Sequence, residues 1–158
     1  MTTAVYPGTF DPFTLGHLDV LKRAARLFDR VILAVAESEK KKTLFTLEER
    51  IALAQASCEE EQGLENVTVE GFRGLLCDFA KARGVTVSVR GARAVSDFEY
   101  EFQMSLTNKK LNPELETVFL TTSAENMYLS SSIVKQIAMF GGDIFRFCPG
   151  LHFKGYPG

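Results

Sequence analysis

The sequence lacks the features that would place a chain in a membrane, outside the cell or on a nucleic acid. No apolar run reaches the roughly 18 residues that a transmembrane helix needs. No basic N-terminal region followed by an apolar stretch suggests an export signal. The formal net charge of -2 gives no basic surface for nucleic acid. We therefore expect a cytoplasmic protein with no membrane and no nucleic-acid partner.

Cysteine is also scarce. Cys58, Cys77 and Cys148 are far apart and odd in number, a pattern typical of reduced thiols packed as small apolar side chains. Their spacing matches no metal site, so we predict no protein ligands for a metal. No internal repeat or low-complexity linker divides the 158 residues. The length therefore predicts one domain, residues 1–158, with a core of ordinary size.

What the sequence does have is a regular alternation of β-prone and helix-prone segments. Strands are predicted at residues 2–6, 31–36, 67–71, 85–89 and 117–120. Helices are predicted from residue 18, from residue 47 after a capping box at Thr46 and Glu49, over 75–83 and 97–111, and after 130–132. Because crossovers between parallel strands are right-handed, this order predicts an α/β fold. The expected architecture is a single-domain, Rossmann-like, doubly wound sheet of five parallel strands with helices on both faces.

Gly16 and His17 fall in the first turn of the first predicted helix, after a turn predicted at Pro7-Gly8. Free backbone N–H groups and the positive end of the helix dipole favour a phosphate there. Gly16 would let a ligand approach the backbone, and the imidazole of His17 could donate to a phosphate oxygen. From the spacing alone, ordinary loop chemistry is an equally good interpretation.

Three more segments follow predicted strands or open a helix and carry anion-binding groups. The lysines at 40–42 suit a solvated loop, but at the carboxyl edge of a buried strand one of them becomes a phosphate candidate. For the arginines in segment 90–93 a ligand role is favoured over a surface salt bridge, and Glu101 is expected in solvent or paired with them. The serines at 130–132 stand at the start of a second helix that could bind a phosphate. The alternative is that one serine is the N-cap and the others have no ligand role. Segments that follow parallel strands lie at the same edge of the sheet. We therefore expect these segments to lie together there, beside the switch in strand order.

Residues 6–17, Tyr-Pro-Gly-Thr-Phe-Asp-Pro-Phe-Thr-Leu-Gly-His, resemble the nucleotide-binding signature of the nucleotidylyltransferases. The long form resembles the phosphopantetheine adenylyltransferases. Segments 45–50, 89–95, 97–101, 112–116 and 130–135 match that family in the same order. The resemblance runs from Ala4 to about Phe147, and residues 148–158 form an atypical tail. Asn126 stands where the family often has an aromatic residue.

The resemblance implies a reaction. Enzymes of this family use ATP with Mg²⁺ to adenylylate 4′-phosphopantetheine, which gives dephospho-coenzyme A and pyrophosphate in coenzyme A biosynthesis, and they are typically homohexamers. The Mg²⁺ would be bound mainly through the ATP phosphates. ATP would be contacted by Thr9, Phe10, His17, Gly91, Ala92, Arg93, Glu101, Asn126, Met127, Tyr128, Leu129, Ser130, Ser131 and Ser132. The 4′-phosphopantetheine would be held by Thr9, Lys41, Leu76 and Arg90.

A substrate phosphate is already a nucleophile at neutral pH, so no activating base is required. We therefore expect direct in-line displacement without a covalent enzyme intermediate. His17, Lys41 and Arg90 are the predicted catalytic residues, and they would act through position and charge. Two alternatives stay open at this point. One is a related nucleotidylyltransferase with another phosphate acceptor, and the other is a non-catalytic nucleotide-binding module.

Overall fold

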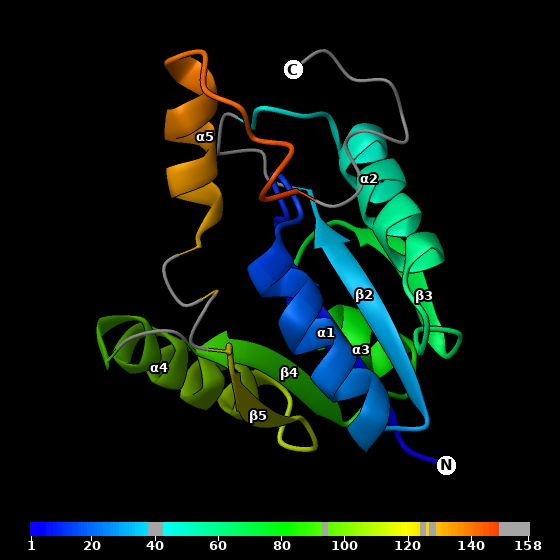
Figure 1. Cartoon of the computed structure of the whole chain (residues 1–158). Helices are drawn as coiled ribbons and strands as arrows, with labels where there is room; N and C mark the ends of the chain where they lie inside the picture. Colours follow the sequence, from blue (N-terminus) through cyan, green and yellow to red (C-terminus); the bar gives the residue numbers. More distant parts are fainter. Residues whose placement is uncertain (38–42, 93–94, 124–125, 127–128, 149–158) are drawn as a thin grey trace.

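Strands and helices alternate along the chain, as the sequence predicts (Figure 1). The computed structural model describes residues 1–37, 43–92, 95–123, 126 and 129–148, with side chains from residue 99 onward in the fourth helix. The elements are β1 (Thr3–Gly8), α1 (Leu15–Leu27), β2 (Arg30–Ala36), α2 (Leu47–Glu60), β3 (Val67–Phe72), α3 (Leu76–Ala82), β4 (Val87–Ala92), α4 (Val95–Leu111), β5 (Glu116–Thr121) and α5 (Ser131–Met139).

The five strands form one parallel sheet in the order β3-β2-β1-β4-β5. The chain therefore leaves β1 in one direction and returns to its other side at β4, which makes β1 and β4 the switch point. β1 pairs with β2 from Thr3 to Gly8, whereas it pairs with β4 only at Ala4 and Val5. The two central strands thus part before their carboxyl ends. In doubly wound sheets this is the position at which ligands bind.

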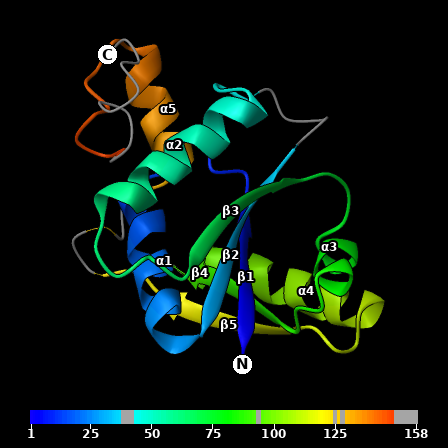
Figure 2. The same ribbon diagram turned by 90° about the vertical axis from the view of Figure 1, so that its right-hand side faces the viewer.

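β2 shows how the sequence builds a two-faced sheet. Its apolar run alternates between the faces, because successive side chains of a strand point to opposite sides. Val31, Leu33 and Val35 pack in the cluster that contains α1 and α2, and Ile32 and Ala34 pack in the cluster that contains α3. Figure 2 shows α1 on one side of the sheet and α3 and α4 on the other. The prediction of helices on both faces is confirmed.

The predicted end of the first strand was wrong, whereas the prediction that Gly16 and His17 lie in the first turn of the first helix is confirmed. Pro7 and Gly8 are the last residues of β1, not a turn, and Pro7 lies opposite Ala34 of β2. A proline without an N–H is tolerated at the end of a strand, where the ladder is finishing. α1 begins at Leu15 and includes Gly16, because the Thr14 side chain caps it.

The fourth strand is also displaced from its prediction, over Val87–Ala92 rather than 85–89. Arg90 and Gly91 therefore belong to the end of a strand, where the backbone is fixed by pairing with Phe119 and Leu120 of β5. The capping box of Thr46 and Glu49 is confirmed at the start of α2.

The three cysteines are free thiols, as predicted. Burial raises the pKa of Cys58 to about 11, with the charge of Glu59 acting in the same direction, and burial raises the pKa of Cys148 to about 12. A thiol with such a pKa is protonated at neutral pH and is a poor nucleophile. Across the part of the chain that the structure describes, no helix combines the length and apolar character of a membrane span.

Candidate active site

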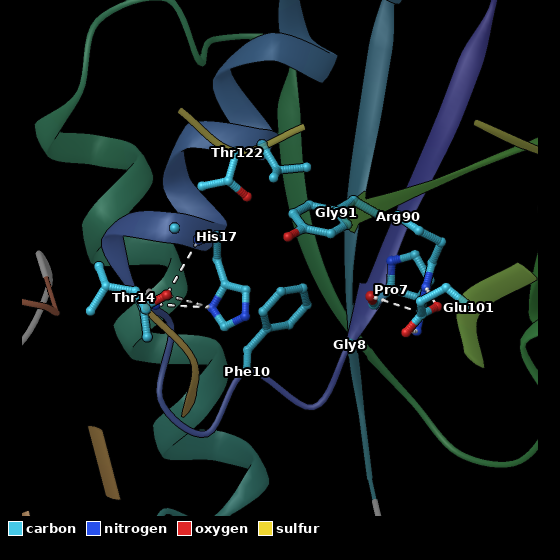
Figure 3. A pocket seen from close by; sticks show the side chains of 13 residues that line it. Pro7, Gly8, Phe10, Thr14, His17, Arg90, Gly91, Glu101 and Thr122 are labelled. Carbon is cyan, nitrogen blue, oxygen red and sulfur yellow. Dashed lines mark hydrogen bonds and ion pairs between the residues drawn. The ribbon is translucent and has the colours of Figure 1, made fainter. Parts of the chain in front are cut away.

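A pocket opens where β1 and β4 part, with a cavity volume of about 160 Å³ (Figure 3). Its walls come from the end of β1, the segment that follows it, the first turns of α1, the end of β4, one residue of α4 and the residues after β5. Both the His17 imidazole and the Arg90 guanidinium line it, on separate elements. The lining residues are Tyr6, Pro7, Gly8, Phe10, Thr14, Gly16, His17, Val20, Arg90, Gly91, Glu101, Thr122 and Leu129.

Phe10 shapes the wall beside His17. It takes a φ of 49°, a left-handed conformation that is uncommon for residues other than glycine. Its ring lies over Gly8, where an added Cβ would come within 2.9 Å of the ring. The same ring meets His17 edge-on, with centroids 4.9 Å apart, and Tyr6 edge-on at 5.3 Å. Gly8 therefore makes room for the ring that supports the imidazole.

His17 is the third residue of α1 and completes a capping box with Thr14. The Thr14 hydroxyl accepts from the His17 backbone N–H at 3.3 Å, and Nδ1 of His17 accepts from the Thr14 backbone N–H at 3.0 Å. Because Nδ1 accepts a hydrogen bond, the proton of the neutral ring is on Nε2. This assignment rests on the hydrogen-bond pattern. The helix start thus fixes the imidazole as an Nε2–H donor beside the first turn of α1.

Arg90 lies at the end of β4 in a two-pronged ion pair with Glu101 of α4 (Figure 3). Its Nε donates to Oε2 at 2.6 Å and its Nη2 donates to Oε1 at 2.9 Å, while Nη1 donates to the Pro7 carbonyl at 3.4 Å. The pairing expected for Glu101 is therefore present. Of the five N–H donors of an arginine, one each on Nη1 and Nη2 has no partner among the described residues.

The serines that open α5 hold the helix in place. Ser130 is the N-cap, and its hydroxyl accepts from the Ile133 N–H at 3.1 Å. Ser131 donates its hydroxyl to the Pro12 carbonyl at 3.1 Å. A further contact joins Asp19 of α1 to Ser123, which follows β5 and whose N–H and hydroxyl both donate to Asp19 Oδ2 at 2.5 Å. Burial alone would raise the pKa of Asp19, but hydrogen bonds from Ser123 and Arg23 outweigh it and lower that pKa.

The structure brings some of the predicted site residues together and separates others. Phe10, His17, Arg90, Gly91, Glu101 and Leu129 line the pocket. Thr9, Leu76, Ala92, Asn126 and residues 130–132 are not among its lining. Leu76 packs with Val5 and Ile32 on the α3 face of the sheet, and the Thr9 carbonyl accepts from Arg50. Lys41, Arg93, Met127 and Tyr128 lie outside the described residues.

Three charged residues around this site had no role in the sequence prediction. Asp11 is 1% exposed and Arg50 is 2% exposed, and Lys135 of α5 lies 3.1 Å from the Asp11 carboxylate. All three stand inside segments that carry the family resemblance, 6–17, 45–50 and 130–135. The only available signal was that position, because the contacts join residues far apart in the sequence.

Among the described residues, no group of three His, Cys, Asp or Glu side chains could hold a metal ion. Glu101 is the one carboxylate among the described pocket-lining residues, and Arg90 already neutralises it. The pocket-lining side chains therefore suit a divalent ion that is coordinated mainly by the phosphate oxygens of a bound nucleotide, rather than one coordinated by protein ligands alone.

Comparison with known proteins agrees with this geometry. The sequence model of the cytidylyltransferase-like family matches residues 5–137. The chain is 57% identical over 148 residues to the phosphopantetheine adenylyltransferase of Methylococcus capsulatus, which covers 94% of this chain and 90% of the relative. The chain belongs to the phosphopantetheine adenylyltransferase family. A family member from Moorella thermoacetica is 56% identical over 149 residues, 94% of this chain and 91% of the relative.

Solved structures outside the phosphopantetheine adenylyltransferase family share the fold. A nicotinic acid mononucleotide adenylyltransferase from Plasmodium falciparum matches with a TM-score of 0.69 at 14% identity, over 90% of this chain and 86% of that one. A bifunctional NMN adenylyltransferase/ADP ribose pyrophosphatase from Francisella tularensis matches with a TM-score of 0.68 at 16% identity, over 92% and 44%. These likenesses confirm the Rossmann-like architecture alone.

Proposed function

We propose that this chain transfers the adenylyl group of ATP to 4′-phosphopantetheine and releases dephospho-coenzyme A and pyrophosphate, a step of coenzyme A biosynthesis. The observation that carries the proposal is 57% identity over 94% of the chain to a relative that bears this name. The pocket supports it, because an imidazole donor and a guanidinium from different elements face one cavity at the switch point.

The reaction is an in-line displacement at the α-phosphorus of ATP. A phosphate oxygen of the acceptor forms the new P–O bond as the bond to pyrophosphate breaks, so the enzyme forms no covalent intermediate. Holding the two anions in line can contribute about 7–11 kcal/mol. Nε2–H of His17 donates to an oxygen on which charge develops, a contact typically worth roughly 3–4 kcal/mol. The first turn of α1 adds its dipole to the same point.

Arg90 binds the acceptor phosphate through the two N–H groups, one each on Nη1 and Nη2, that neither Glu101 nor the Pro7 carbonyl uses. The bidentate contact with Glu101 holds the guanidinium plane at a fixed angle beside the Pro7 carbonyl. A pre-oriented guanidinium loses less conformational entropy when it binds a phosphate. Lys41, Thr9 and Leu76 complete the acceptor site in this proposal.

The nucleotide is held by the remaining residues that the family resemblance assigns. They are Thr9, which also belongs to the acceptor site, and Phe10, His17, Gly91, Ala92, Arg93, Glu101, Asn126, Met127, Tyr128, Leu129, Ser130, Ser131 and Ser132. Mg²⁺ supplies charge neutralisation on the ATP phosphates, where it is bound mainly by phosphate oxygens and water.

The protein acts as a homo-oligomer in the cytoplasm, and the family resemblance makes a hexamer the expected form. α4 exposes large apolar side chains over much of its length, among them Tyr100, Phe102, Leu106 and Leu111. Monomers rarely leave such a surface in water, so a second copy is the natural cover. Light scattering coupled to gel filtration tests this directly, and a monomeric mass at micromolar concentration would contradict it.

An acceptor panel tests the proposed function. The purified chain is incubated with ATP and Mg²⁺ and with 4′-phosphopantetheine, nicotinamide mononucleotide or nicotinic acid mononucleotide, and pyrophosphate release is measured. The proposal requires release with 4′-phosphopantetheine at a rate far above the other acceptors. Release only with a mononucleotide would favour a related nucleotidylyltransferase, and ATP binding without any release would favour a binding module. A CTP arm checks the nucleotide in the same assay.

A further inference from the structure

Asp11 lies at a junction of three segments that the proposed function assigns to ligands. Its carboxylate accepts from the backbone N–H of Leu44 at 2.7 Å and of Phe45 at 2.9 Å. It also forms an ion pair with Lys135 of α5 at 3.1 Å. One side chain of the signature segment 6–17 thus holds both the chain that follows lysines 40–42 and the helix that follows serines 130–132.

Arg50 of α2 makes a second set of contacts to the same region. Its Nη1 donates to the carbonyls of Thr9 at 2.7 Å and Ala36 at 2.8 Å, and its Nε donates to the Phe45 carbonyl at 3.2 Å. Burial lowers the pKa of Arg50, whereas the charges of Asp11 and two glutamates act to raise it. Arginine remains charged in proteins, so the three carbonyls face a full positive charge.

The two side chains together fix both ends of the segment between β2 and α2. Arg50 holds Ala36, the last residue of β2, and both Arg50 and Asp11 hold Phe45, one residue before the cap of α2. The Glu37 N–H also donates to the Phe72 carbonyl of β3 at 2.9 Å. Lysines 40–42 therefore belong to a short stretch of chain whose two ends are tied to the signature segment.

A charge buried to this extent needs a reason beyond packing. Fully buried charged groups are destabilising unless they are paired and hydrogen-bonded, and apolar replacements are often as stable. Here the hydrogen bonds of Asp11 and Arg50 go to backbone atoms of loop and strand ends, which side chains of the apolar core could not hold. These contacts specify where the loop and strand ends lie, which a well-packed apolar pair of the same volume could not do.

We infer that Asp11 and Arg50 are positioning residues for adenylyl transfer, which fix the described chain on either side of lysines 40–42, at Ala36 and at Leu44 and Phe45, to the signature segment. The inference rests on the proposed function for the identity of the acceptor. It predicts that weakening this tether impairs binding of the acceptor more than it impairs binding of ATP. A merely structural role predicts lower stability with unchanged kinetic constants at temperatures where the protein is folded.

The test is Asp11→Asn, which keeps the shape of the side chain but leaves one oxygen to accept two backbone N–H groups. Hydrogen exchange on the ligand-free protein is expected to speed up at the Leu44 and Phe45 amides. Steady-state kinetics at saturating ATP is expected to show a KM for 4′-phosphopantetheine raised by about 10- to 100-fold. The KM for ATP should change by a smaller factor.

Asn112→Ala is the matched control for lost stability. Asn112 is also buried, at 7% exposure, and it joins two segments by accepting from the Glu114 N–H and donating to the Cys77 carbonyl, both at 3.3 Å. It lies before β5, at the opposite edge of the sheet. This variant should unfold more easily and keep both KM values. Equal changes of KM in Asn112→Ala and Asp11→Asn would overturn the inference.

Arg50→Lys covers the case in which Asp11→Asn does not fold, because one ammonium group cannot replace the fork that spans three carbonyls. The same rise in the KM for the acceptor is expected. Slow exchange at Leu44 and Phe45 in Asp11→Asn would show that the carboxylate does not hold these amides, and fast exchange with normal KM values would show that the tether does not position the acceptor. Failure of the proposed function appears separately, as a wild-type chain that does not release pyrophosphate with 4′-phosphopantetheine.

Discussion

The two edges of the sheet differ in how their charges are used. At the carboxyl edge the pocket has a volume of about 160 Å³, and its Arg90 and Glu101 side chains are partly shielded from solvent and paired with each other. At the amino edge a wider hollow of about 840 Å³ is lined by Arg30, Glu70 and Arg83. There Arg83 and Glu70 pair with each other at 2.7 Å in exposed positions, and Glu70 raises the pKa of Arg83. The larger hollow thus holds an exposed ion pair, whereas the smaller pocket holds the more shielded pair of Arg90 and Glu101.

The backbone explains the difference between the edges. α1 and α5 begin at the carboxyl edge, where free N–H groups and the positive ends of the helix dipoles attract anions. At the amino edge, α1 ends with its carbonyls satisfied by a side chain. Asn66 donates to the carbonyls of Ala25 at 2.9 Å and Phe28 at 3.0 Å. In the part of the chain that the structure describes, the carboxyl edge is therefore the edge whose helix starts favour anions.

If the carboxyl edge carries the reaction, the largest fall in kcat is expected from substitution of His17. His17→Ala should lower kcat by about 10²-fold or more, because it removes a donor to developing charge, while ATP binding weakens less. His17→Gln is the matched variant, since glutamine at the third helical position can keep the capping box. We expect turnover to fall in both variants and thermal stability to fall mainly in His17→Ala. Near-normal kcat in His17→Gln would remove the imidazole from the reaction.

Arg90→Lys should have the next largest effect. Lysine keeps the charge but cannot form the two-pronged contact with Glu101, so the cation is no longer held at a fixed angle. We expect the KM for 4′-phosphopantetheine to rise by about 10-fold. Initial rates measured over a range of acceptor concentrations check this. A variant with unchanged KM would show that Arg90 serves only its ion pair.

Asp19→Asn should have a small, pH-dependent effect on the free energy of unfolding. The pKa of Asp19 in the folded chain lies below its ordinary value of 3.8. Its stabilising contribution is therefore complete above that ordinary value and disappears as the pH falls through the folded pKa. Urea unfolding should show the wild type more stable than the variant by on the order of 1 kcal/mol at neutral pH. The difference should narrow below about pH 4, and a difference that grows in acid would contradict the assignment.

The smallest effect is expected at the amino edge. Arg83→Ala breaks an exposed ion pair, and such pairs contribute little to stability. Turnover and both KM values should equal those of the wild type. A loss of activity in this variant would break the contrast between the two edges, because the wider hollow would then take part in the reaction.

Much of the fold could be read from local patterns, because these patterns follow local physics. The apolar run of 31–36 predicts a strand buried on both faces, and Thr46 with Glu49 predicts the start of α2. The end of β1 and the position of β4 were not predicted correctly, because Pro7 and Gly91 suggest turns unless the neighbouring strands are known. Strand pairing overrides such local preferences.

The site divides in a similar way. Gly16 and His17 could be placed at a helix start from spacing, and Arg90 at a strand end. The tether by Asp11 and Arg50 could not be found, since the bonds of Asp11 to Leu44 and Phe45 and of Arg50 to Thr9 join residues 33 to 41 positions apart. Leu76 packs against the α3 face of the sheet and is not among the pocket-lining residues, so its role at the acceptor stays a prediction from the family resemblance.

The capping box of α1 has a consequence for anyone who tries to make this protein more robust. Glutamate is the residue that designers place at the third position of a helix, and His17→Glu would satisfy Thr14 and favour the helix dipole. The same change would set a carboxylate in the path of incoming phosphates. The residue at position 17 that gives the highest thermal stability is therefore not the one that gives the highest reaction rate. Variant libraries selected for heat resistance alone will tend to yield inactive protein.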